Sequence, residues 1–259
     1  MLATLRWVLP TALPVFLFVV LVQRTDPRRE PRWLVVTTFV LGASLAVVAL
    51  FATTRAAALT GLDALMPATS ATVFLFFIAA PIQEAAKVAA AWPAWLTKHV
   101  DEPYDGVVYA AASALGFAAV ENWFVLRAHP LGYIWIARAL IALPSHVFFA
   151  CLWGYALGRA RHSRLRLPIF PAAFLASIVA RGLYSYFVYG RGPGALLAVS
   201  PLLAAMGAVT WILARDLRER HERSAGSSPV SSTRWARLSA VAPRAPSLSA
   251  VRAALSRAD

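Results

Sequence analysis

Charged side chains within apolar runs are the residues of this chain best placed to do chemistry. The run "FFIAAPIQEAAKVAAAW" at 76–92 holds a carboxylate and an ammonium beside Gln83. A charged group in lipid costs roughly 2.5–3.5 kcal/mol on insertion scales, so each is a functional candidate. The charged or ionisable residues in such runs are Glu84, Lys87, Glu121, Arg138, His146 and Arg181.

Two acids and one imidazole suggest metal-assisted hydrolysis. Glu84, Glu121 and His146 would offer zinc two oxygens and one nitrogen, and would leave a position for water. A bound metal lowers the pKa of that water toward neutrality and polarises a peptide carbonyl. The chain has no HExxH motif. The prediction therefore requires three separate helices to bring these side chains to one pocket.

Two prolines mark the polar sites. Glu84 and Lys87 are three positions apart and share a helix face, so we expect them to pair. The alternative is that Lys87 only neutralises Glu84. Pro81 and Pro144 each precede a polar residue by two positions, and proline interrupts helical hydrogen bonding. Because broken helices at membrane depth are tolerated where they line a wet cavity, both sites are expected to face water.

The elements that must position these residues are membrane helices. Hydrophobic residues make up 59% of the 259 residues and charged residues only 14%, too little polar surface for a water-soluble globule of this length. We predict an all-α, polytopic bundle of about seven spans, each near the ~20 residues that a helix needs. The expected spans are 7–23, 33–52, 68–91, 105–126, 131–158, 168–189 and 194–214.

Basic residues predict the orientation. Alternate loops carry most of the arginine, which by the positive-inside rule places the N-terminus outside and the C-terminus in the cytoplasm. The run 7–23 lacks a small-residue cleavage site before Arg24 and is interpreted as an anchor. The net charge of +13 is read as a topological feature, helped by anionic lipids at the cytoplasmic face, and not as nucleic-acid binding. We expect a multi-pass protein of the cytoplasmic membrane.

Composition also suggests two regions. Residues 1–217 form the predicted transmembrane domain, and residues 218–259 a basic cytoplasmic tail whose Ser, Ala, Pro and Arg bias predicts disorder. The single cysteine, Cys151, excludes disulfides and cysteine-ladder metal sites. The expected span 105–126 is rich in Ala, Gly and Ser, which lets neighbouring helices approach closely and suggests a central helix. On straight helices, however, Glu84 and Glu121 would lie at different depths.

At these residues the sequence resembles the PrsW family of intramembrane metalloproteases, in the wider group that includes the type II CAAX prenyl proteases. The family is marked by Glu-Glu-x-x-Lys, by Phe-x-x-x-Glu-Asn, by a later histidine and by a final His-Gly-Leu-Tyr-type motif. This chain has "QEAAK" at 83–87, "DEPYDGVVYAAASALGFAAVEN" from Asp101, and "LPSHVFFACLWGYALG" around His146. The resemblance covers roughly 74–190.

The resemblance implies roles for the matching residues. Glu84 and Glu121 would bind or activate water and a metal, expected to be zinc. His146 would be a metal ligand, and Lys87 would orient the carboxylate of the first motif. Asn122 completes the second motif. Substrates would be membrane-anchored proteins, including regulators of the anti-sigma type.

Two positions depart from the family pattern and leave alternatives open. Gln83 replaces a glutamate, and an amide is no general base near neutral pH. The last motif reads "ARGLYSY", with Arg181 in place of histidine and Ser185 where Asn or Asp is usual. Arginine cannot ligate and repels a dication, so Arg181 would fill the metal position and pair with Glu84 or Glu121. The chain would then be a catalytically degenerate scaffold or binding protein. A third interpretation is a small proton-coupled transporter that uses the same acids and histidine as a relay.

Overall fold

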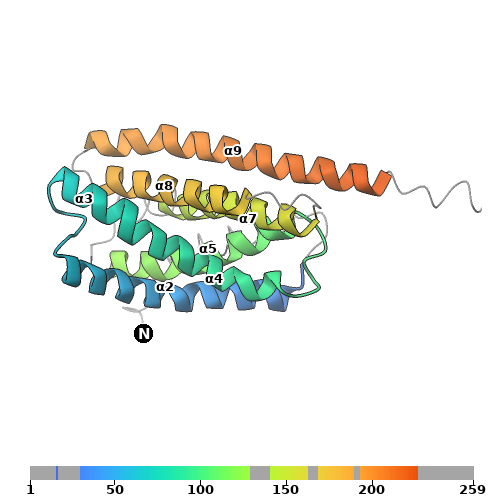
Figure 1. The fold of residues 1–259 in the computed structure, drawn as a ribbon, viewed down its shortest axis with the longest axis horizontal. Coiled ribbons are helices and arrows are strands. Elements are labelled where there is room, and N and C mark those ends of the chain that lie inside the picture. The colour runs from blue at the N-terminus through green and yellow to red at the C-terminus, as the bar shows by residue number, and fades with distance from the viewer. Residues whose placement is uncertain (1–15, 17–29, 129–140, 163–168, 190–192, 227–259) are drawn as a thin grey trace, which may run out of the picture. The chain divides into compact units, whose positions relative to one another are not determined.

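The computed structural model describes residue 16 and residues 30–128, 141–162, 169–189 and 193–226 (Figure 1). The expected span 7–23, apart from Phe16, lies outside these residues. So do Arg138 and the tail beyond 226. The chain divides into a unit at Met1–Arg218 and a second at Glu219–Asp259, of which 219–226 are described and helical.

All regular structure in the described part of the chain is helical, which confirms the predicted all-α class there. The helices are α2 (Arg32–Thr60), α3 (Ala68–Phe74), the π-helix η1 (Leu75–Ala79), α4 (Ala80–Trp95), α5 (Asp105–Ala128), α7 (Leu143–His162), α8 (Ile169–Tyr189) and α9 (Pro193–Gly226). Within the first unit, α5 packs against α2, α4 and α7, and α8 packs against α7 and α4.

Four helical stretches are long and apolar enough to cross a membrane, and the chain is an integral membrane protein. These stretches are Arg32–Thr60, Ala68–Trp95, Asp105–Arg127 and Ile169–Tyr189. They coincide with four of the predicted spans. Helix α7 covers part of the predicted span 131–158, and α9 covers all of the predicted span 194–214. The count of seven and the orientation stay predictions. Large apolar side chains such as Trp33, Val47 and Phe51 on α2 are exposed, as suits a lipid-facing surface.

Small residues place α5 inside the bundle, as its composition predicted. Ala110, Ala114 and Ala118 are fully buried. A β-carbon added at Gly116 would collide with the backbone carbonyl of Phe39 on α2, so only glycine allows this approach. The helix that carries Glu121 is therefore held by close backbone contact with its neighbour.

The predicted interruptions at the two prolines take a mild form. Pro81 lacks the N–H that an α-helix would bond to the carbonyl four residues earlier. The chain absorbs this as η1, a single π-helical stretch of five residues that runs directly into α4 without a break. A π-bulge of this kind shifts the helical register and is frequent at functional sites. Pro144 is the second residue of α7, and the two described residues before α7, 141 and 142, are also π-helical, so a register shift adjoins this proline too.

Candidate active site

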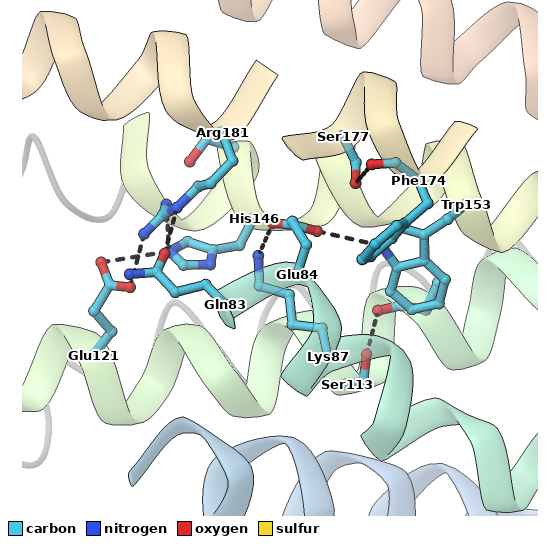
Figure 2. A network of polar contacts seen from close by, with 12 residues as sticks. Gln83, Glu84, Lys87, Ser113, Glu121, His146, Trp153, Phe174, Ser177 and Arg181 are labelled. Atoms are coloured by element: carbon cyan, nitrogen blue, oxygen red, sulfur yellow. Dashed lines mark hydrogen bonds and ion pairs between the residues drawn. The ribbon is translucent and has the colours of Figure 1, made fainter. Parts of the chain in front are cut away.

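Arg181 on α8 lies at the centre of the polar cluster. Its Nε donates to Gln83 Oε1 at 2.7 Å, and its Nη2 donates to Glu121 Oε2 at 2.9 Å. Its Nη1 lies 3.2 Å from Nε2 of His146. Figure 2 shows the guanidinium between these three side chains. Four helices thus converge on one cation, which is 3% exposed.

The local fold explains the convergence. Gln83 follows the π-helical shift by four residues and lies on the first turn of α4. His146 is on the first turn of α7 and Glu121 is in the last third of α5. A β-carbon at Gly182 would collide with the ring of Phe76 in η1, so this glycine lets α8 bring Arg181 close to Gln83. The long arginine side chain then spans the remaining gap.

His146 and Glu121 are close to each other as well as to Arg181. Nε2 of His146 lies 3.7 Å from Oε1 of Glu121. Since Nε2 faces a guanidinium donor, we assign its lone pair to that contact and the ring proton of the neutral imidazole to Nδ1. Nδ1 is buried and has no hydrogen-bond partner. The Glu121 side chain keeps 23% of its surface exposed, whereas the imidazole has none.

Glu84 takes part in a second, separate contact group. Lys87 Nζ lies 2.5 Å from Glu84 Oε1, and both side chains are fully buried, so the expected pair forms. The indole N–H of Trp153 donates to the other carboxylate oxygen at 3.3 Å (Figure 2). Lys87 Nζ also lies 5.2 Å from the centre of the Phe117 ring, within the range of a cation–π contact. Both oxygens of Glu84 are therefore engaged by neighbouring side chains.

Trp153 and Phe117 were absent from the residues predicted for the site. Trp153 follows His146 by seven positions, which is two helical turns, so both residues lie on the same face of α7. This spacing is the sequence feature that could have identified Trp153 as a site residue. Phe117 stands four positions before Glu121 on α5, and its ring centre is 5.8 Å from that of His146. It fills the space between the two contact groups.

A cavity of about 180 Å³ opens beside Glu121. This volume is well above the roughly 10–15 Å³ that one water needs, and below the size of drug-sized ligand pockets. Asn122, the other predicted residue of the second motif, is 5% exposed and does not line the cavity. Among the lining residues are Gln83, Glu121, Arg181 and Ser185, with Leu75, Phe117, Phe124 and Val188 on the apolar walls.

The arrangement does not fit the predicted zinc ion while Arg181 holds its place. Zinc would need its ligand atoms about 2.0–2.2 Å away, yet Nε2 of His146 and a carboxylate oxygen of Glu121 are both directed at the guanidinium. A dication there would face a fixed positive charge. The third predicted ligand, Glu84, is engaged by Lys87 and Trp153.

What the site offers instead is a carboxylate next to a fixed cationic donor at the edge of a cavity of about 180 Å³. A guanidinium stabilises negative charge that develops on a carbonyl oxygen, and does so most strongly where water is scarce. A carboxylate within reach can take a proton from water. Both groups belong to the chemistry of acyl transfer.

Comparison with known proteins also indicates a protease. The family described as "PrsW family intramembrane metalloprotease" matches residues 30–213. Protease PrsW of Oceanobacillus iheyensis is 28% identical over 191 residues, which are 73% of this chain and 83% of that protein. Protease PrsW of Geobacillus kaustophilus is 37% identical over 92 residues, or 35% of this chain and 40% of that protein. Protease PrsW of Clostridioides difficile is 27% identical over 153 residues, or 56% and 63%.

No solved structure matches this chain. The family match covers well over half of the sequence and includes all four helices that meet at Arg181. The relatives are named as proteases, which supports protease function for the group. This chain belongs to the PrsW family of intramembrane metalloproteases.

Proposed function

We propose that this chain hydrolyses peptide bonds of membrane-anchored proteins at the cavity beside Glu121 and Arg181. The observation that supports this most is the 2.9 Å contact between the two side chains at the wall of that cavity. A carboxylate and a cationic donor, 2.9 Å apart, can engage a water and a carbonyl oxygen together. Membrane-anchored substrates agree with the family match and with the apolar walls of the cavity.

Arg181 is proposed as the donor for the carbonyl oxygen. Its guanidinium stays protonated under all physiological conditions, so the positive charge is always present. Gln83 and His146 hold two other edges of the guanidinium and fix its plane. A donor positioned before the substrate arrives costs no reorganisation during the reaction, and removing one such donor typically lowers kcat by about 100- to 1,000-fold.

Glu121 is proposed as the general base. In the free enzyme the Glu121 carboxylate is held in its ion pair with Arg181. When a carbonyl oxygen takes up the guanidinium hydrogen bonds, that restraint is reduced and Glu121 can remove a proton from water. The water oxygen bonds to the carbonyl carbon, the proton passes through Glu121 to the amide nitrogen, and the C–N bond breaks. Ser185, four positions after Arg181 and on the same cavity wall, would donate a second hydrogen bond to the oxyanion.

The pair of Glu84 and Lys87 is proposed to position the site. Both side chains are fully buried and engaged with each other, so neither reaches the cavity. Lys87 and His146 both contact the Phe117 ring, which connects the pair to the reacting groups. Zinc has no part in this proposal, because the donor groups are directed at Arg181.

The setting of the reaction is also a proposal. From the basic loops we expect the tail to lie in the cytoplasm and to contact anionic lipids, and the substrates would include membrane-anchored regulators of the anti-sigma type. The apolar cavity walls suit the side chain of a membrane-embedded residue. The protein would act in the cytoplasmic membrane.

A second candidate function is that of a catalytically inactive family member that binds other membrane proteins. The observation in its favour is that Nε, Nη1 and Nη2 of Arg181 are each in contact with a protein side chain. A cation engaged on all three nitrogens can lock the bundle without serving a substrate. Breaking such a buried pair costs about 3–5 kcal/mol, so the cluster would resist mutation without catalysing anything.

The test compares cells that carry the wild-type chain with cells that carry Glu121→Gln. Fragments of membrane proteins are identified by mass spectrometry of new termini, a method that finds substrates without a preselected candidate. A candidate found in this way is then cleaved by purified chain in proteoliposomes. We expect cleavage by the wild type and a loss of at least about 100-fold in Glu121→Gln, the usual size of a general-base effect.

The matched control is Asp63→Asn, which removes an exposed carboxylate in the loop after α2. This control should cleave like the wild type. If no fragment depends on Glu121, the hydrolase proposal is wrong and the binding function is favoured. Flux driven by a pH gradient in the same liposomes, without cleavage, would favour the transporter instead.

A further inference from the structure

Three carboxylates meet where the chain enters α2 and α5. Glu30 comes just before α2, Asp101 lies in the loop after α4, and Asp105 is the first residue of α5. Each has a carboxylate oxygen within 4.8 Å of one from each of the other two. No other three His, Cys, Asp or Glu side chains among the described residues come this close to one another. The site proposed for hydrolysis does not use it.

Asp105 is the most informative member of this acidic cluster of Glu30, Asp101 and Asp105. Its side chain is almost fully buried, at 1% exposure. One carboxylate oxygen, Oδ2, accepts the backbone N–H of Glu102 at 2.7 Å, whereas the other, Oδ1, is buried and receives no N–H or O–H from the described residues. The Asp105 side chain also lies within hydrogen-bonding reach of Glu30, a second carboxylate that has no proton to donate when it is ionised. A buried carboxylate oxygen without a donor costs the full desolvation of that atom. The usual compensation for such an atom is a proton, a water or a cation.

The neighbouring groups are arranged to hold the cluster together. The hydroxyl of Tyr109, one helical turn along α5, donates to Oε2 of Glu30. A β-carbon at Gly158 of α7 would collide with the carbonyl of Pro103, so the loop that carries the acids is pressed against α7. Three carboxylates at this separation repel one another, and one of them has little access to water. Positive charge between them removes both penalties.

The donor atoms indicate the class of ion. All three are carboxylate oxygens, which suit hard cations such as Ca²⁺ and Mg²⁺. Oxygen atoms around one Ca²⁺ lie roughly 2.3–2.6 Å from it, so ligands on opposite sides are up to about 5 Å apart. The observed separations meet this limit without movement of the backbone. Asp101 is exposed, which leaves a side of the site open to water and to the ion.

We propose that Glu30, Asp101 and Asp105 form a binding site for a hard divalent cation of the calcium and magnesium class. The ion would join the start of α2 to the start of α5. Asp105 and Glu121 are sixteen positions apart on α5, about 24 Å along the helix axis, so the ion takes no direct part in hydrolysis. Its effect is to fix the position of α5, and the proposal holds whether or not the chain is a protease.

The experiment uses the purified full-length chain in detergent. Thermal unfolding is followed after EDTA treatment, and then with CaCl₂ or MgCl₂ added. We expect the wild-type Tm to rise by several degrees with at least one of the two ions, since a ligand that binds only the folded state stabilises it. Isothermal titration with the same salts should give saturable binding near one ion per chain. A wild-type chain that responds to neither ion overturns the proposal.

Two substitutions locate the site. Asp105→Asn should lose the ion response, with affinity weakened at least about tenfold, because it removes a charged ligand. In EDTA the same variant should be as stable as the wild type or more so, since it relieves repulsion among the carboxylates. A residue that only supports the fold is not expected to lose the ion response and yet keep or gain stability in EDTA. Asp105→Asn binding as tightly as the wild type would contradict the site.

Asp63→Asn is the matched control, because it removes an exposed carboxylate from a different loop. It should keep the full ion response. If Asp105→Asn does not fold, the exposed ligand is replaced instead, as Asp101→Asn. This second variant should also bind the ion at least about tenfold more weakly, and an unchanged affinity would overturn the proposal.

Discussion

Nη2 of Arg181 on α8 donates a 2.9 Å hydrogen bond to Oε2 of Glu121 on α5, across sixty positions of sequence. This contact sets the charge of the site. The same guanidinium lies 3.2 Å from His146, so the two side chains best suited to bind a metal share a protein cation instead. Whether Glu121 and His146 can hold a metal therefore depends on Arg181.

The metal content of the purified protein follows from this contact. We expect the wild-type chain to hold much less than one equivalent of zinc after dialysis. The double substitution Gln83→Glu with Arg181→His restores the family pattern at both positions. It removes the fixed cation and adds two potential ligands. The double variant should bind close to one zinc per chain. Inductively coupled plasma mass spectrometry measures both.

Gln83→Glu alone is the control for the metal measurement, because it adds a carboxylate and leaves Arg181 in place. It should remain close to the wild type. One full equivalent of zinc in the wild-type chain would show that the guanidinium moves away from His146 and Glu121. The metal would then return to the mechanism.

The buried pair of Glu84 and Lys87 makes a prediction about stability. Lys87→Met removes the ammonium and leaves Glu84 as an uncompensated charge at 0% exposure. Removing one partner of such a pair costs about 3–5 kcal/mol. The double variant Glu84→Gln with Lys87→Met removes both charges and should recover most of that loss. Denaturant unfolding in detergent, followed by circular dichroism, gives the free energies.

Lys98→Met serves as the control, because Lys98 lies in the loop after α4 and takes no part in this pair. It should unfold like the wild type. A single variant Lys87→Met that is as stable as the double variant would mean that Glu84 is neutral without its partner. The pair would then contribute little to stability.

Several features of this site were readable from the sequence, and the reasons are local. The pairing of Glu84 with Lys87 follows from a spacing of three on one helix. The central place of α5 follows from its Ala and Gly content, since small residues are what close helix contacts require. The membrane helices follow from composition. Each of these inferences uses neighbours in sequence or the average character of a segment.

The contacts between distant helices were not readable in the same way. Straight helices would place Glu84 and Glu121 at different depths. In the structure the two carboxylates belong to two separate contact groups. Arg181 joins Gln83 to Glu121, whereas Glu84 contacts Lys87 and Trp153. Which of Glu84 and Glu121 pairs with Arg181 depends on how each helix is rotated about its axis and on how far the arginine side chain extends. Periodicity does not encode either.

Trp153 carries a third prediction, because its indole N–H is one of the two side-chain donors to Glu84. Trp153→Phe keeps an aromatic ring in a fully buried position and removes only the donor. Loss of a buried hydrogen bond to a charged group costs about 1–3 kcal/mol. Unfolding in denaturant should show this loss. Trp211→Phe, at an exposed position on α9, is the matched control and should change stability by less than about 0.5 kcal/mol.

A larger effect on cleavage than on stability in Trp153→Phe would show that Trp153 positions Glu84 for the reaction. Equal stability of Trp153→Phe and the wild type would mean that the 3.3 Å contact contributes nothing measurable. The outcome separates a packing role from a polar one. Activity of the two tryptophan variants should be measured on the same fragment assay.

Gly116 and Gly207 provide the last prediction, since the same substitution should have opposite effects at the two positions. Alanine is favoured over glycine by about 1 kcal/mol within a helix, so Gly207→Ala on α9 should stabilise slightly. A β-carbon there meets only the Phe148 ring, at 3.5 Å. At Gly116 it collides with the backbone carbonyl of Phe39, which no side-chain rotation can relieve. Forcing α2 and α5 apart should cost about 1–3 kcal/mol and exceed the helical gain. Because α5 carries Glu121, Gly116→Ala should also lower cleavage, and a Gly116→Ala chain as stable and as active as Gly207→Ala would show that the two helices can separate without disturbing the site.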